Sequence, residues 1–254
     1  MEPLDPRSIA LRGAQVRVVA QCASTNSVLL EEGPPQPTLL AAETQTAGRG
    51  RRGRRWRSAP GAGITFSLAR LVARPQRELA GLSLVAGVAA AQALRALGAA
   101  QVSLKWPNDL LARGAKLGGI LVETRMQRRT PLAVVGIGIN YLHDEGLERG
   151  VRRPIAFLQD LLSPLPSRNL VIRRIGEALL DALRRFDAGG LEALREDWLA
   201  LHAHAGLRMR VRLADGRSVT GIASGLEGDG SLQLRTRSGV RAIRSGRVLS
   251  ARPA

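Results

Sequence analysis

Two apolar runs of strand type constrain the fold of this chain more than any other feature of its sequence. Residues 117–123 and 132–139 are dominated by Leu, Ile and Val, and their apolar content predicts central strands of a sheet. Shorter β-type runs lie at 15–20, 38–43, 63–69 and 102–106. Residues 77–97, 169–187 and 191–204 instead carry apolar side chains at helical spacing. The alternation predicts an α/β (or α+β) fold built on a mixed sheet.

The pattern changes after Gly206. Short strand-like runs at 207–213, 218–226, 231–236 and 240–243 are separated by Asp-Gly and Gly-rich turns. Short strands with such tight turns predict a small β-barrel of about fifty residues. We therefore expect two domains, spanning residues 1–204 and 205–254, with the folded part of the first beginning near residue 15.

The formal net charge of +17 is the strongest compositional signal. It indicates a polyanionic partner, such as nucleic acid, an anionic membrane or an acidic protein, or else a compositional bias toward arginine. Only Lys105 and Lys116 are lysines, so 36 of the 38 basic residues are arginine. The two lysines are therefore candidates for roles in which a compact ammonium fits and a planar guanidinium does not.

The chain also excludes several classes of protein. Cys22 is the only cysteine, which rules out an internal disulfide and a cysteine-based zinc cage. No uninterrupted run of eighteen apolar residues predicts a membrane span, and the N-terminus lacks the pattern of a secretory signal. We expect a cytoplasmic protein.

A glycine- and arginine-rich segment follows the second predicted strand. Residues 47–57 hold six arginines and three glycines without an acidic residue. Glycines let the backbone approach a ligand, and guanidinium groups bind phosphate in bidentate fashion. The segment is expected to order over an anion, although a solvated loop or a nucleic-acid patch would have the same composition. It is not a Walker A loop, because no Gly-Lys-Ser/Thr ends it.

Three further segments end or begin strands. The first, KWPND at 105–109, is expected to turn the chain at Pro107 and leave Asn108 and Asp109 in a loop. The second, KLGGILVE at 116–123, places Lys116 just ahead of a buried strand. The third, GIGIN at 136–140, leaves one face of a strand bare, which suits a flat ring. Each is weak alone, since turns, surface lysines and lone G-x-G patterns are common.

In this order and spacing, the segments together resemble the biotin–protein ligases over residues 15–205. The matching segments are Ser24-Thr25-Asn26, residues 43–47 (ETQTA), GRGRRGRRW at 48–56, KWPNDL, KLGGILVE and GIGIN. The terminal β-module resembles the SH3-like domain of that family. The resemblance implies the mixed-sheet fold shared by biotin ligases and class II aminoacyl-tRNA synthetases.

The resemblance also implies the reaction. Family members form biotinyl-5′-adenylate from biotin and MgATP and pass biotin to a lysine of a biotin carboxyl carrier protein. Cations stabilise the meeting of carboxylate and α-phosphate. The implied catalytic residues are Lys116, Arg49, Arg51 and Asp109. The implied ATP and adenylate contacts are Arg49, Arg51, Arg52, Lys116 and Asn140, with Arg54 as a helper. The metal site is left open beyond the Mg2+ that accompanies ATP.

The biotin ring system is implied to lie in a mostly apolar slot with a few donors and acceptors. The implied biotin-binding residues are Ser24, Thr25, Asn26, Gln45, Gly48, Arg49, Gly50, Arg51, Trp56, Lys116, Gly119, Gly136 and Gly138. The aromatic cover that relatives place over adenine is not evident in residues 146–159, so the adenine contacts remain unassigned.

The expected partner is a carrier protein with an acidic surface, and no membrane. About fourteen residues precede the first predicted strand, which leaves no element for specific DNA binding. Monomer and homodimer both stay open. Two alternatives remain: a lipoate or octanoate ligase or transferase of the same fold, and a basic nucleic-acid-binding module. The GRGRRG and KWPND segments favour biotin over lipoate, and an aromatic content of 3% argues against nucleic acid.

Overall fold

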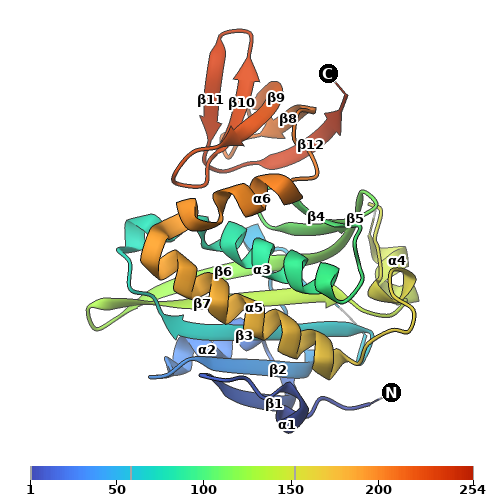
Figure 1. Cartoon of the computed structure of the whole chain (residues 1–254). Coiled ribbons are helices and arrows are strands. Elements are labelled where there is room, and N and C mark those ends of the chain that lie inside the picture. The colour runs from blue at the N-terminus through green and yellow to red at the C-terminus, as the bar shows by residue number, and fades with distance from the viewer. Residues whose placement is uncertain (1, 58, 152, 254) are drawn as a thin grey trace.

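The computed structural model describes residues 2–57, 59–151 and 153–253 and is built on a seven-stranded mixed sheet (Figure 1). The strand order is β1-β2-β3-β7-β6-β5-β4. Strands β1 and β2 pair in parallel, and every other neighbouring pair is antiparallel. The strands are β1 (Gln15–Cys22), β2 (Thr38–Gln45), β3 (Gly63–Leu71), β4 (Val102–Lys105), β5 (Asp109–Ala112), β6 (Ala115–Gln127) and β7 (Thr130–Asn140). The two apolar runs, in β6 and β7, lie inside the sheet, as predicted.

Helices cover both faces of this sheet (Figure 1). Along the strands, neighbouring side chains point to opposite faces, so Leu39 packs into the main core with α3 and α5 while Leu40 packs against Leu29 of α2. The helices are α1 (Pro6–Ile9), α2 (Thr25–Glu32), α3 (Leu82–Ala96), α4 (Glu145–Gly150), α5 (Arg168–Gly189) and α6 (Arg195–Leu201), with short 3-10 turns at Arg51–Gly53, Gln76–Gly81, Leu158–Asp160 and Gly190–Leu194. The N-terminal residues of α2 contribute to the main cavity described below.

The stretch Gln76–Ala96 is long and apolar enough to cross a membrane by composition alone, although its apolar run is interrupted. Within the fold, 72% of its most apolar window is buried. Its side chains pack on α5, α6 and the sheet, so its hydrophobicity is accounted for by the core.

A second, antiparallel sheet of five strands follows α6, in the order β11-β10-β9-β8-β12. The boundary predicted near 204–206 falls between α6 and the first of these strands. Hydrogen bonds link this sheet to the rest of the chain: Trp106 Nε1, just after β4, donates to Gly230 O at 3.1 Å, and Arg195 Nη2 of α6 donates to Leu226 O at 2.7 Å. The strands are β8 (Arg208–Arg212), β9 (Ser218–Leu226), β10 (Leu232–Thr236), β11 (Gly239–Ile243) and β12 (Arg247–Arg252).

Three expectations about local structure are wrong. The fold does not begin near residue 15, because Leu4, Ile9 and Leu11 are buried and α1 packs on α5. A helix between the first two predicted strands was not expected, yet Ser24 caps the helix α2. Asp109 does not sit in a loop, because it opens β5, opposite Lys105 of β4. In the last two cases, polar residues that favour turns instead mark the first residue of a regular element.

Candidate active site

The main cavity has a volume of about 310 Å³ and lies where the N-terminus of α2, the loop after β2 and strands β5–β7 meet. Most of the predicted site residues come together here from separate parts of the chain. Those lining the cavity are Ser24, Thr25, Asn26, Gln45, Arg49, Gly50, Arg51, Arg52, Arg54, Trp56, Asp109, Lys116, Gly119, Gly136 and Gly138. Gly48 and Asn140 do not line it.

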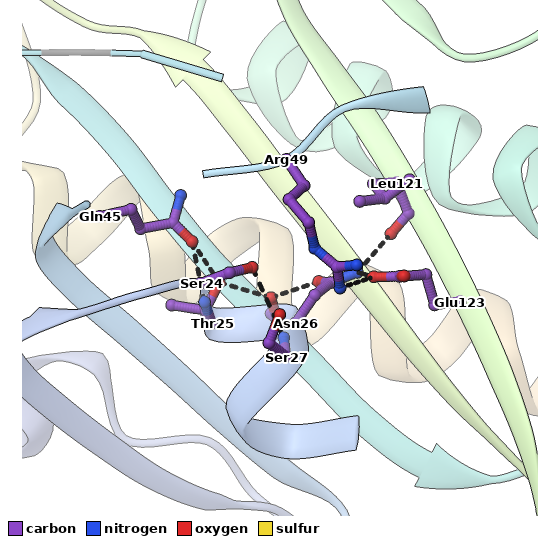
Figure 2. Close-up of polar contacts among 9 residues, drawn as sticks. Ser24, Thr25, Asn26, Ser27, Gln45, Arg49, Leu121 and Glu123 are labelled. Carbon is purple, nitrogen blue, oxygen red and sulfur yellow. Dashed lines mark hydrogen bonds and ion pairs between the residues drawn. The ribbon is translucent and has the colours of Figure 1, made fainter. Parts of the chain in front are cut away.

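One end of the cavity is a network of neutral polar groups (Figure 2). Gln45 Oε1 accepts from the backbone N–H of Thr25 at 2.8 Å. Ser67 Oγ donates to Asn26 Oδ1 at 2.6 Å and lies 2.6 Å from Thr25 Oγ1. Because Ser67 gives its one proton to Asn26, the proton in the shorter Thr25–Ser67 contact comes from Thr25, whose hydroxyl also lies 3.2 Å from Gln45 Oε1. Ser67 was missed by the sequence analysis, where it is only a small polar residue within an apolar strand.

The orientation of the Asn26 amide is fixed from its other side. Asn26 Nδ2 donates to Leu121 O at 3.1 Å and to Glu123 Oε2 at 2.9 Å, and both partners are acceptors only. Glu123 Oε2 also pairs with Arg49 Nη2 at 2.8 Å (Figure 2). Glu123 therefore connects the neutral network to the arginine-rich loop by pairing with Arg49.

Two glycines of β7 make room for these side chains. A Cβ at Gly136 would lie 2.2 Å from Asn26 Oδ1, and a Cβ at Gly138 would lie 2.3 Å from Trp56 Cε2. Trp56 thus lies directly against the bare strand. Its buried Nε1 has no hydrogen-bond partner among the described residues, so a donor is directed into the site without an acceptor.

The other end of the cavity holds an ion pair between Lys116 of β6 and Asp109 of β5. Both side chains are mostly buried, with 15% and 17% exposed. Burial lowers the pKa of Lys116, repulsion from Arg153 and Arg54 lowers it further, and Asp109 opposes both effects. Lys116 is therefore a confined cation, and Asp109 counteracts the effect of burial on its pKa.

The backbone of Lys116 is held from several directions. Its N–H donates to Pro154 O at 3.0 Å, and its carbonyl accepts from Ala156 N at 2.9 Å and from Asn140 Nδ2 at 3.0 Å. Asn140 therefore positions the lysine strand from outside the main cavity. Gly48 also acts outside it: its carbonyl accepts from Trp56 N at 2.9 Å and closes the arginine-rich loop as a hairpin.

The charge of the cavity wall is strongly positive. Nine cationic side chains line it, whereas Asp109 is its one acidic residue within the described parts of the chain. Burial lowers the pKa of Arg51, and the neighbouring Arg52 and Arg54 lower it further. Burial likewise lowers the pKa of Lys105, assisted by Arg153, Arg247 and Arg54 against the opposing effect of Asp109. Such a wall favours an anionic ligand or an anionic transition state.

The C-terminal sheet contributes a part of the wall that the sequence analysis missed. Residues 246–249 line the cavity, and Arg52 Nη2 donates to Ser245 Oγ at 3.0 Å. Arg247 and Arg153 were also missed, because neither lies in a recognisable motif.

A second cavity, of about 340 Å³, lies on the other side of Lys116. It shares Lys116, Trp56, Arg55 and Arg153 with the main cavity. The segment after β7 supplies an aliphatic part of its wall, from Leu147, Val151 and Ile155. The full set of lining residues is Arg55, Trp56, Arg57, Lys116, Asn140, Leu147, Gly150, Val151, Arg153 and Ile155. Phe157 is not among them, because it is buried and stacks on His143 with ring centroids 4.4 Å apart.

The described residues contain no group of three His, Cys, Asp or Glu side chains that could hold a metal ion. The single carboxylate in the main cavity is already paired with Lys116. A resident divalent metal does not fit this donor set. The geometry instead suits two ligands that meet at Lys116. One has a neutral polar group that reaches the network at the end of the main cavity, and the other is anionic.

Models of known families match both parts of the chain. Residues 18–140 match the biotin/lipoate A/B protein ligase family, and residues 208–249 match the biotin protein ligase C terminal domain.

Individual relatives match over most of the chain. A biotin--[acetyl-CoA-carboxylase] ligase of Mycobacterium tuberculosis is 37% identical over 247 residues, which cover 91% of this chain and 90% of the relative. The bifunctional ligase/repressor BirA of Escherichia coli is 35% identical over 88% of this chain and 70% of its own length. Among solved structures, the biotin protein ligase of Aquifex aeolicus in complex with biotin and ATP has a TM-score of 0.79 and 28% identity. The match covers 94% of this chain and 99% of that one.

Proposed function

The chain belongs to the biotin protein ligase family, and from this we propose that it activates biotin with ATP and transfers it to a lysine of a biotin carboxyl carrier protein. The observation that carries the proposal is the position of Lys116, which lines two cavities of suitable size. One cavity takes biotin and the other takes the nucleotide, so the two reacting anions meet at one buried ammonium.

The neutral network and Trp56 suit the head of biotin. The ureido group has a carbonyl acceptor and N–H donors, and hydroxyl and amide groups of Thr25, Asn26 and Gln45 lie at one end of the main cavity. The unpartnered Trp56 Nε1 is a further donor. The bare face of β7 at Gly136 and Gly138 leaves space for a flat ring system.

The nucleotide is assigned to the second cavity. Arg55, Arg153 and Lys116 supply charge for the phosphates, and Leu147, Val151 and Ile155 supply an apolar surface for the adenine. In this chain, aliphatic side chains would cover the adenine, in place of the aromatic cover expected from the family. ATP enters as its magnesium complex, with the metal carried by the substrate.

In the first step, a carboxylate oxygen of biotin attacks the α-phosphorus of ATP and pyrophosphate leaves. Lys116 and the arginines of the loop stabilise the negative charge that accumulates on the transferring phosphate. In the second step, the neutral ε-amine of the acceptor lysine attacks the carbonyl carbon of the mixed anhydride, and AMP leaves. Asp109 holds Lys116 in place. It is also the one acidic residue that lines the main cavity within the described parts of the chain, which makes it the candidate acceptor for the proton that the amine loses.

Ligand selectivity tests the assignment. Pyrophosphate release from ATP is measured with biotin, lipoate and octanoate as alternative acids. Release that depends on biotin, with lipoate and octanoate near background, supports the proposal. Equal or faster release with lipoate would overturn it in favour of the sibling activity. A filter-binding assay with duplex DNA at physiological salt checks the nucleic-acid alternative, which requires retention on the filter.

A further inference from the structure

One face of the C-terminal sheet carries arginines on two neighbouring strands. On β8, Met209 and Val211 are buried while the residues between them are exposed. On β12, Val248 is buried. The exposed arginines of the pair, here called the arginine ladder, are Arg208, Arg210, Arg212, Arg247 and Arg252.

The ladder places like charges opposite one another. In the antiparallel register, Arg212 faces Arg247 and Arg208 faces Arg252, with Arg210 opposite Ser250. Directly opposed like charges destabilise a strand pair. Among the described residues, no ladder arginine forms an ion pair. The acidic residues of the C-terminal sheet are engaged elsewhere: Asp215 with Arg217, Asp229 with Arg244 and Glu227 with Gln233.

Exposed arginines without an ion pair among the described residues also occur at the other end of this sheet, at Arg235 and Arg241. The ladder is set apart by its directly opposed charges and by its continuity with the main cavity. The exposed arginines of α5 follow the same bias in composition, yet they have acidic partners. Arg174 pairs with Glu177, Arg184 with Asp181, and Arg185 with Asp197 of α6. The ladder differs from α5 by lacking neighbouring carboxylates, so its charge remains available to another molecule that also reaches the main cavity.

The ladder is continuous with the active site. Strand β12 is an end strand of its sheet, and its first residue, Arg247, also lines the main cavity. Ser245, two residues before Arg247, is linked to the arginine-rich loop, because its Oγ accepts a hydrogen bond from Arg52. A molecule that reaches into the cavity from this side therefore lies over β12 and β8.

We propose that the arginine ladder docks an acidic face of the biotin-acceptor domain during the second step; this rests on the function proposed above. The nine cationic side chains of the cavity repel an approaching lysine ammonium. Carboxylates on the acceptor that pair with the ladder offset that repulsion and orient the lysine toward Lys116. Nucleic acid fits less well, because neither β8 nor β12 carries an aromatic side chain for stacking.

The test compares two double variants of the full chain with equal loss of charge. The ladder variant is Arg208→Gln with Arg210→Gln, neither of which lines a cavity. The control is Arg235→Gln with Arg241→Gln, on β10 and β11 at the other end of the same sheet. Each protein is assayed for biotin-dependent pyrophosphate release without acceptor, and for biotin transfer to a recombinant carrier domain of net negative charge.

The ladder variant is expected to release pyrophosphate at the wild-type rate and to show a KM for the carrier raised at least about fivefold, with kcat within about twofold. Its KM should also respond less to added salt than that of the wild type. The control should match the wild type in both assays.

Three results would overturn the inference. The first is a carrier KM for the ladder variant that stays at the wild-type value. The second is an equal rise in the carrier KM of the ladder and control variants. The third is an unchanged carrier KM combined with lost binding of a DNA duplex. If wild-type protein released pyrophosphate with biotin but never labelled the carrier, the proposed acceptor would fail. If it released none, the proposed activation of biotin would fail before the ladder is tested.

Discussion

At the scale of single residues, Lys116 is a buried ammonium shared by two cavities. Its Nζ already lies 3.2 Å from where a Cβ at Gly119 would be, so a guanidinium has little room beside two anions. We predict that Lys116→Arg lowers biotin-dependent pyrophosphate release by about 100-fold or more. Steady-state kinetics measure this, with Lys105→Arg as the comparison, and wild-type release in Lys116→Arg would refute the role.

The pH profile of adenylation reports on the partner of this lysine. Burial lowers the pKa of Lys116 and Asp109 raises it, so removing the carboxylate should lower that pKa further. If charged Lys116 is required, Asp109→Asn shifts the alkaline limb of pyrophosphate release to lower pH, while Asp109→Glu keeps the limb closer to its original position. Superimposable profiles for wild type and Asp109→Asn would show that Asp109 does not set the charge of Lys116.

At the scale of elements, the arginine-rich loop is a closed hairpin in the structure rather than an open segment. Gly50 N donates to Arg54 O at 2.7 Å, and Arg52 adopts a left-handed conformation with φ of 59°. Exposed arginines make it a substrate for trypsin. We predict that biotin and ATP together slow cleavage within residues 49–57 by roughly tenfold or more, because the loop closes over the intermediate. Gel and mass analysis of the fragments measure this; equal cleavage with and without ligands would contradict it.

The strongly patterned elements could be predicted, and the short polar ones could not. Strands β6 and β7 were recognised because a continuous apolar run has few alternatives. Helix α2 was missed because serine, threonine and asparagine favour turns and helix caps alike, and Ser24 turned out to cap. Strand β5 was missed because its four residues directly follow the turn at Pro107 and are too few to show a strand pattern. Strand β12 was missed because its apolar and polar residues do not alternate regularly and its partner, β8, is distant in sequence.

The site divides in the same way. Residues within motifs, such as Gln45, Lys116 and Gly138, line the cavity as the sequence suggested. Ser67, Arg153 and Arg247 could not be assigned, because their place in the site depends on how strands β3 and β12 and the segment after β7 meet in space. Arg49 was assigned as an anion contact, and its pairing with Glu123 could not be read from residues 74 positions apart.

At the scale of the whole molecule, a buried histidine, His202, lies in the segment between α6 and the C-terminal sheet. His202 stacks on Trp198 with centroids 4.4 Å apart and bridges to Leu104. Burial lowers the pKa of His202 from 6.5 to about 3, with a smaller contribution from His204. The unfolded chain therefore binds a proton that the folded chain excludes between these values, so the stability from a neutral His202 is complete above pH 6.5 and is lost as pH falls.

This junction predicts acid sensitivity of the fold. Protonation of His202 in the unfolded chain lowers the free energy of unfolding by about 2 kcal/mol between pH 6.5 and about pH 5. In His202→Phe, which keeps an aromatic ring against Trp198, the drop in unfolding free energy on acidification should be smaller by a similar amount. Urea unfolding at the two pH values measures the difference. Identical drops in the two proteins would mean that His202 is protonated without cost.

The most direct test of the central claim is the mass of a carrier domain after incubation with this protein, biotin and MgATP. The account predicts that one lysine of the carrier gains the mass of a biotinyl group, and that the gain requires both biotin and ATP. It also predicts that Lys116→Arg largely abolishes the gain. An unmodified carrier in the complete reaction, or modification by lipoate in preference to biotin, would contradict the account.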